Sequence, residues 1–196
     1  LMFKKITYTF IVSFLALNSF AQNNSGEIHG NFDLNMQSYQ EDELIGAKAA
    51  DEIILNNAYL NINYTKGDFA AGLRYESYLN ALMDFDDNYK GNGIPFRYAA
   101  YSIDGLDVTV GNYYEQVGSG LIFRSYENKG LGADNAMDGI RLKYSPLKGV
   151  YLKSFIGKSR TYFTYADGII RGADGEININ EALDFESKTR IIIGQG

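Results

Sequence analysis

Apolar and polar residues alternate one by one along much of this chain, in runs that end at turn-forming residues. Successive side chains of a β-strand point to opposite faces, so a period of two predicts strands with one apolar and one polar face. The clearest pair of runs, 57–64 and 69–78, is joined by Thr65-Lys66-Gly67-Asp68, a short Gly-containing loop typical of a hairpin. This pattern restricts the chain to antiparallel sheet.

Further runs extend the same pattern. A second hairpin is predicted at 140–144 and 150–156, and another strand at 106–115. Weaker alternation predicts strands at 27–39, 96–103, 121–126, 160–165, 175–180 and 189–193. Three stretches rich in acidic residues, Asn and Gly, at 41–54, 81–94 and 128–137, are predicted to be loops, the first with a helical turn at 51–55. The total is about eight to ten strands, with short turns alternating with long loops.

The first 21 residues have the form of a secretory signal peptide. Lys4 and Lys5 precede an apolar run from Ile6 to Leu17, and Ser19-Phe20-Ala21 then gives a small-residue cleavage box. The run is shorter than the roughly 20 residues of a membrane-spanning helix. We therefore expect residues 1–21 to be removed and the remainder to act outside the cytoplasm.

The composition of the chain argues against several classes of function. The first 21 residues hold two of the 18 Lys and Arg and no acidic residue, which leaves 16 basic against 24 acidic side chains. We therefore expect no nucleic-acid partner. The chain has no Cys, so it lacks the residues for a thiolate metal site. Its one histidine, His29, lies in the first predicted strand, and no Gly-x-Ser-x-Gly elbow is present, which argues against a serine triad. We expect no enzyme activity and no cofactor.

One acidic cluster raises the question of a metal site. Asp84, Asp86 and Asp87 stand close together, and Ca²⁺ takes several oxygen ligands from a single loop. The EF-hand spacing fails, because Gly91 comes two positions late and Pro95 occupies the twelfth position. A solvated surface loop is the simpler interpretation, and a cation site is the alternative.

Charged residues recur on the polar faces of the predicted strands. A membrane barrel turns its polar faces inward, whereas a sandwich turns them to bulk water. The signal peptide, strand lengths close to the roughly 9 to 11 residues of a tilted membrane strand, and Tyr near strand ends favour the barrel. We predict an all-β fold, an antiparallel up-and-down transmembrane β-barrel, with these lumen-facing candidates: Arg74, Glu76, Glu115, Arg141, Lys143 and Lys153.

Three blocks of sequence carry a resemblance to a known family: Gly91-Asn92-Gly93-Ile94, then Asp104-Gly105-Leu106-Asp107-Val108-Thr109-Val110-Gly111-Asn112-Tyr113-Tyr114-Glu115-Gln116-Val117-Gly118-Ser119-Gly120-Leu121, and Asp134-Asn135-Ala136-Met137-Asp138-Gly139-Ile140-Arg141. They resemble the domain of unknown function 6029 family, outer-membrane β-barrel proteins of Gram-negative bacteria. The resemblance implies an outer-membrane location and supplies no catalytic residues. Because the family's members run much longer, we expect residues 22–196 to be the N-terminal portion of a single barrel.

The functional expectation follows from the cationic candidates. Lys and Arg in a lumen attract small anionic solutes in a porin-like manner, or they pair with lumen carboxylates and stiffen the barrel. We expect an outer-membrane protein surrounded by lipid that serves solute passage or acts as a scaffold for a protein partner. The alternative is a secreted β-sandwich that binds carbohydrate or protein through Tyr113, Tyr114 and Tyr126.

Overall fold

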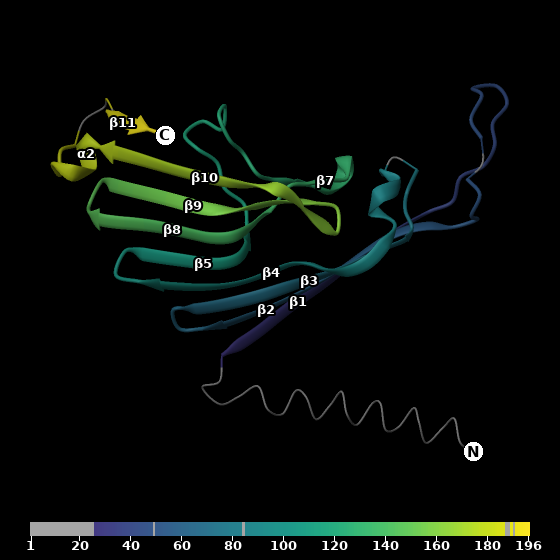
Figure 1. Ribbon diagram of the computed structural model, residues 1–196, viewed down its shortest axis with the longest axis horizontal. Helices are drawn as coiled ribbons and strands as arrows, with labels where there is room; N and C mark the ends of the chain where they lie inside the picture. The colour runs from purple at the N-terminus through teal and green to yellow at the C-terminus, as the bar shows by residue number, and fades with distance from the viewer. Residues whose placement is uncertain (1–25, 49, 84, 187–188, 190) are drawn as a thin grey trace, which may run out of the picture.

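The computed structural model describes residues 26–48, 50–83, 85–186, 189 and 191–196, so the predicted signal peptide lies outside the described residues. Within them, nine antiparallel strands form one meandering sheet (Figure 1). Their order across the sheet is β1 (Glu27–Gln37), β2 (Leu55–Lys66), β3 (Phe69–Asn80), β4 (Gly91–Ile103), β5 (Leu106–Tyr113), β8 (Met137–Leu147), β9 (Val150–Thr161), β10 (Thr164–Asn178) and β11 (Ile192–Gln195).

The remaining elements are short. Between β5 and β8 lie β6 (Glu127–Asn128), η2 (Lys129–Leu131) and β7 (Ala133–Asp134), and β6 pairs only with β7. The 3₁₀ turn η1 (Asp87–Tyr89) precedes β4, and the single-turn helix α2 (Ile179–Ala182) follows β10. No helix among the described residues is both long and apolar enough to cross a membrane.

The two ends of the sheet differ. At one end β2–β3, β4–β5 and β8–β9 are joined by tight turns, and at Asp104-Gly105 both residues have positive φ, 46° and 78°, as a type I′ turn requires. At the other end lie the long connections 38–54, 81–90 and 114–136. The predicted alternation of short turns and long loops is therefore confirmed from β1 to β9. After that it breaks, because a two-residue turn joins β9 to β10 at the end that holds the long loops.

Most predicted strands are confirmed, and several details were wrong. Both hairpins form, with Ser145 to Leu147 inside β8 rather than in its turn. The predicted strand at 160–165 is the end of β9, the two-residue turn Tyr162-Phe163 and the start of β10. Residues 121–126 make one isolated bridge, Gln116 with Arg124, and no strand, while 51–55 contains no helical turn. In both places tertiary contacts outweigh local preference.

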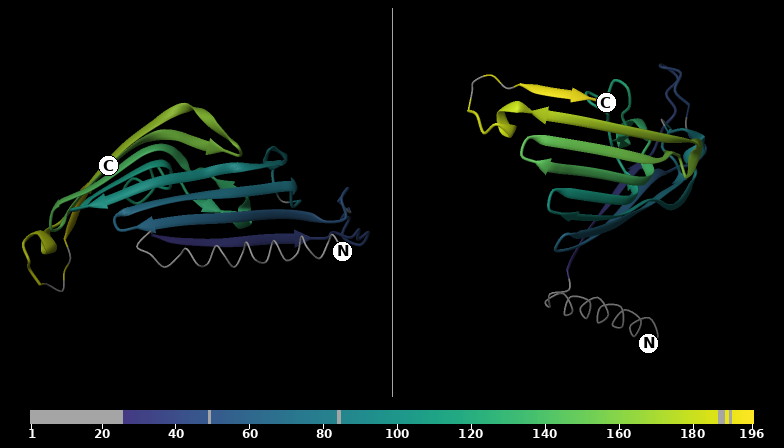
Figure 2. Two further views of the ribbon diagram at one scale, coloured as in Figure 1. Left: turned by 90° about the horizontal axis from the view of Figure 1, so that it is seen from below. Right: turned by 60° about the vertical axis from the view of Figure 1, so that its left-hand side comes forward.

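The sheet is curved (Figure 2). Its two faces differ in polarity. On the outer face, Leu60, Ile62, Leu73, Val110 and Leu142 remain 37–50 % exposed. Aromatic residues join this face near the tight turns: Tyr64, Phe69, Tyr101 and Tyr144. The predicted polar partners of these residues lie on the other face, which is concave and holds the connection between β5 and β8.

Apolar packing is confined to the concave side. One cluster consists of Tyr113, Val117, Met137 and Phe155, with Phe123 stacked on Phe155 at 5.1 Å between ring centroids. A second cluster of aromatic rings joins β2, β3, the 81–90 loop and the tip of the β9–β10 hairpin: Tyr59, Tyr78, Phe85, Tyr89, Tyr162 and Phe163. Both clusters leave the outer face uncovered.

Candidate functional site

The candidate site is the concave face together with residues 114–136, which we call the inward segment. It leaves the sheet after β5, folds back against the concave face and returns to the sheet at β8 (Figure 1). Ala136 and Met137, at its end, have no exposed surface. Two groups of charged residues hold this segment against the strands.

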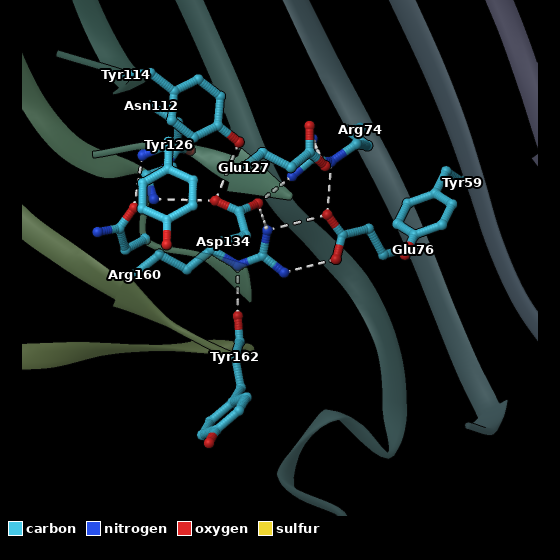
Figure 3. A network of polar contacts seen from close by, with 12 residues as sticks. Tyr59, Arg74, Glu76, Asn112, Tyr114, Tyr126, Glu127, Asp134, Arg160 and Tyr162 are labelled. Carbon is cyan, nitrogen blue, oxygen red and sulfur yellow. Dashed lines mark hydrogen bonds and ion pairs between the residues drawn. The ribbon is translucent and has the colours of Figure 1, made fainter. Parts of the chain in front are cut away.

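The first group, the Glu76 cluster, consists of Arg74 and Glu76 on β3, Arg160 on β9, and Glu127 and Asp134 of the inward segment (Figure 3). Glu76 is 1 % exposed and accepts hydrogen bonds from both guanidinium groups, at 2.6 Å from Arg74 Nε and 2.6 Å from Arg160 Nη2. Asp134 also bridges the two arginines, and Glu127 Oε1 lies 2.8 Å from Arg74 Nη1. Strands that are far apart in the sheet are thereby linked through the segment.

Aromatic residues complete the surroundings of the Glu76 cluster. The Tyr78 hydroxyl lies 3.1 Å from Glu76 Oε2, and the Tyr114 hydroxyl donates to Asp134 Oδ1 at 3.0 Å. The Arg74 guanidinium lies over the ring of Phe96, 5.0 Å from its centroid, and Phe96 in turn stacks on Tyr114. The four most deeply buried charged groups of the cluster, Arg74, Glu76, Asp134 and Arg160, therefore each have several partners, as buried charges require.

The second group, the Glu115 cluster, is built around the carboxylate of Glu115 in the inward segment. Lys153 Nζ lies 3.1 Å from its Oε1, and Lys143 Nζ and Arg141 Nη1 lie 3.4 and 3.8 Å from its Oε2. Asp107 pairs with Arg141 and Asp174 pairs with Lys153. In this cluster the number of cations equals the number of carboxylates.

The protonation equilibria of the segment differ between the two clusters. Burial disfavours the ionised form of Glu115, but the Gln116 backbone N–H and the ammonium groups of Lys153 and Lys143 outweigh it and lower the pKa of Glu115. At Glu127 burial prevails over Arg74, and the pKa of Glu127 is raised. Glu115 is therefore a permanent anchor at neutral pH, and Glu127 is the more easily neutralised one.

All six predicted lumen-facing residues lie on the concave side, but in two separate places. Arg74 and Glu76 belong to the Glu76 cluster, and the other four belong to the Glu115 cluster: Glu115, Arg141, Lys143 and Lys153. Glu115 comes from the inward segment, because β5 ends at Tyr113.

Sequence reasoning missed three members of the Glu76 cluster. Asp134 lay in a predicted loop, Glu127 was assigned to no element, and Arg160 stood at the start of a predicted separate strand. The sequence between the predicted strands 150–156 and 160–165, Gly157-Lys158-Ser159, contains no Pro, Asn or Asp, and this was the one available signal that β9 continues to Arg160. No local pattern indicates that the loop carboxylates turn inward.

The other predicted candidates are scattered. Asp84 lies outside the described residues, Asp86 caps η1 and accepts a hydrogen bond from Tyr162, and Asp87 pairs with Lys90. In the described part of the chain, no group of three or more His, Asp or Glu side chains is arranged to hold a metal ion. His29 is exposed on β1 and pairs with Glu27.

The three tyrosines of the alternative binding platform do not share a surface. Tyr113 is 3 % exposed and donates to backbone carbonyls of β8 and β9, whereas Tyr114 is directed at Asp134. Tyr126 alone is exposed, and it lies beside the Arg124 guanidinium.

A comparison with protein-family models matches residues 2–196 to a family of unknown function, DUF6029. The chain belongs to this family. The match covers the sheet and the inward segment together, and confirms the resemblance carried by the Gly-rich blocks of the sequence. No curated protein matches the chain. No solved structure matches it either.

Proposed function

We propose that this DUF6029 chain forms the wall of an outer-membrane β-barrel whose interior is narrowed by the inward segment, restricting passage to small solutes. The observation that carries the proposal is the opposite polarity of the two sheet faces. The outer face exposes an aliphatic band with aromatic residues near the tight turns, and the concave face holds paired charges. The outer face is suited to contact with hydrocarbon, and the concave face is suited to a polar lumen.

The absence of a covering layer supports a barrel over a sandwich. A sandwich needs a second sheet packed against the apolar face of the first. Among the described residues the other sheet is the two-stranded β6–β7 pair, which contacts the opposite, concave face through Glu127 and Asp134. In a bilayer, the edges presented by β1 and β11 must also be paired, because unsatisfied backbone groups are costly in hydrocarbon.

Charge balance favours internal ion pairing over an anion-attracting lumen. The Glu76 cluster has two arginines and three carboxylates, and the Glu115 cluster has three cations and three carboxylates. We therefore propose a barrel without a marked preference for anions. In planar bilayers under a salt gradient, the parent chain should therefore show a reversal potential near zero. Arg141→Ala with Lys143→Ala leaves Glu115, Asp107 and Asp174 with Lys153 as the one cation of the cluster, so this variant should shift the reversal potential toward cation selectivity. A clearly anion-selective parent chain would contradict this part of the proposal.

The lipid-facing assignment can be tested with one introduced indole. The chain has no Trp, so Leu142→Trp on the outer face gives a single fluorophore. In the full chain folded into phosphatidylcholine vesicles, brominated acyl chains should quench this fluorescence strongly and aqueous iodide should quench it little. Strong iodide quenching without bromine quenching would overturn the proposal. Leu131→Trp, at an exposed position of the inward segment, is the control and should show no acyl-chain quenching.

A further inference from the structure

Three cations lie on the largely apolar outer face, on the side away from the tight turns: Arg97, Lys158, and Arg171 of β10, which stands opposite the outer-face residue Ile156. Arg97 of β4 stands opposite Leu73 in the register, and directly opposite residues of an antiparallel pair share a face. Lys158 of β9 stands opposite Asp138 of β8 on one side and Ile169 of β10 on the other. Ile169 is an exposed apolar residue, and so is Ile156, two positions before Lys158 on the same face. The cations therefore border the aliphatic band rather than the charged interior.

A hollow of about 530 Å³ opens beside Arg97 on this face. Its apolar wall consists of Ala99, Val110 and Ile140, which project outward from three neighbouring strands. Gly111 and Gly139 also line it and contribute backbone alone. In the register, Gly139 stands opposite both Gly111 and Gly157, so this part of the lining is backbone. The hollow is thus apolar along its length and charged at one end.

The Arg97 guanidinium is held in place and still has free donors. Nη1 donates to the Tyr165 hydroxyl at 2.9 Å, and Nη2 lies 3.3 Å from Asp138 Oδ2. A guanidinium has five N–H donors, and the side chain of Arg97 is 54 % exposed. Asp138 pairs with Arg97 at the end of the hollow. Lys158 and Arg171 stand opposite Asp138 and Ile156 beside the hollow, so this part of the outer face has a net positive charge.

We propose that this hollow binds an anionic, phosphate-bearing membrane lipid, with an acyl chain along Ala99, Val110 and Ile140 and the phosphate at Arg97 and Lys158. This inference rests on the proposed function, because it requires the outer face to contact lipid. The apolar wall of the hollow is suited to an acyl chain, and the cations at its end are suited to an anionic headgroup. Guanidinium donors bind phosphate oxygens well.

The Leu142→Trp reporter also tests the lipid site, because residue 142 lies on the same face two positions from Ile140. Vesicles of phosphatidylcholine would contain a small fraction of either dibrominated phosphatidic acid or dibrominated phosphatidylcholine. At equal mole fraction, we expect the anionic lipid to be enriched about fivefold per cation contact near the indole. Arg97→Gln and Lys158→Gln should each reduce this enrichment. Lys158→Gln leaves the hydrogen bonds of Arg97 with Tyr165 and Asp138 in place. Lys66 is an exposed cation beside the β2–β3 turn, so Lys66→Gln is the control and should leave the enrichment unchanged.

The outcomes separate the two proposals. Equal quenching by both brominated lipids would overturn the lipid site and leave the lipid-facing wall intact. Loss of the anionic preference on addition of inorganic phosphate would identify a free-phosphate site and also overturn it. Quenching by neither lipid would instead overturn the proposed function.

Discussion

At the scale of single residues, the most consequential group is the Glu76 carboxylate. It lies 1 % exposed between two arginine side chains that are themselves nearly buried, at 6 % and 1 %. Burying three charged groups is costly unless each is paired, so the cluster is stable only as a unit. Removing the carboxylate leaves Asp134 as the one buried counter-charge shared by Arg74 and Arg160.

Glu76→Gln should therefore lower the free energy of unfolding by about 3 kcal/mol, because both buried guanidinium groups lose an ion pair with this carboxylate and Arg160 keeps only the ion pair with Asp134 among the described residues. The measurement is the urea midpoint of the chain folded in vesicles, followed by the migration of unboiled samples on gels. Glu127→Gln is the matched control. Its carboxylate is 25 % exposed, and Arg74 keeps two other partners, so the loss should be below about 1 kcal/mol. Equal losses in the two variants would contradict this account of the cluster.

At the scale of elements, the hairpins and the inward segment arise from different physics. The tight turns depend on local chemistry, such as the positive φ of Asp104 and Gly105, and the sequence predicts them. The inward segment has little regular structure of its own. Its position depends on carboxylates that meet cations of β3, β8 and β9.

Anchoring by Glu115 should make stability depend on pH. The pKa of Glu115 is lowered below its ordinary value of 4.5, so the folded chain keeps the carboxylate ionised where the unfolded chain takes up a proton. Its contribution to stability is then complete above about pH 4.5 and is lost as the pH falls through the lowered pKa. Glu115→Gln should flatten the fall in the urea midpoint over this acidic range.

Glu127→Gln should change the pH dependence of stability in the opposite direction to Glu115→Gln. The pKa of Glu127 is raised, so the folded chain loses stability at this residue as the pH rises above the ordinary value of 4.5. This substitution should make the midpoint fall less on going from acidic to neutral pH. If both variants keep the pH profile of the parent chain, neither carboxylate anchors the segment as described.

At the scale of the whole molecule, the inward segment decides how much of the interior stays open. It runs along the concave face from the Glu115 cluster, where it meets β8 and β9, to the Glu76 cluster, where it meets β3 and β9. Ion pairs at both clusters hold it, so weakening one cluster should release part of the segment and widen the path through the proposed barrel.

Glu127→Gln combined with Asp134→Asn removes the two carboxylates by which the segment contacts Arg74 and Arg160. Single-channel conductance in planar bilayers should then rise well above that of the parent chain. Asp51→Asn with Glu52→Gln removes the same charge from the exposed 38–54 connection and should leave the conductance unchanged. Conductance that is equal in all three proteins would argue against the segment as the constriction.

The sequence by itself determined the antiparallel sheet, its tight turns and the polarity of its faces, because alternation and turn chemistry act between residues close together in the chain. Alternation also placed five charged residues on the concave face, whereas Glu115, which was predicted within a strand, belongs to the inward segment because β5 ends at Tyr113. Only the tertiary structure decided which cation meets which carboxylate. The contact of Arg160 with Glu76 joins residues 84 positions apart, and it depends on the curvature of the sheet and on a loop folding inward. No local sequence pattern predicts the curvature or the inward folding of the loop, because the partners of a buried ion pair are residues that are close in space and not in the chain.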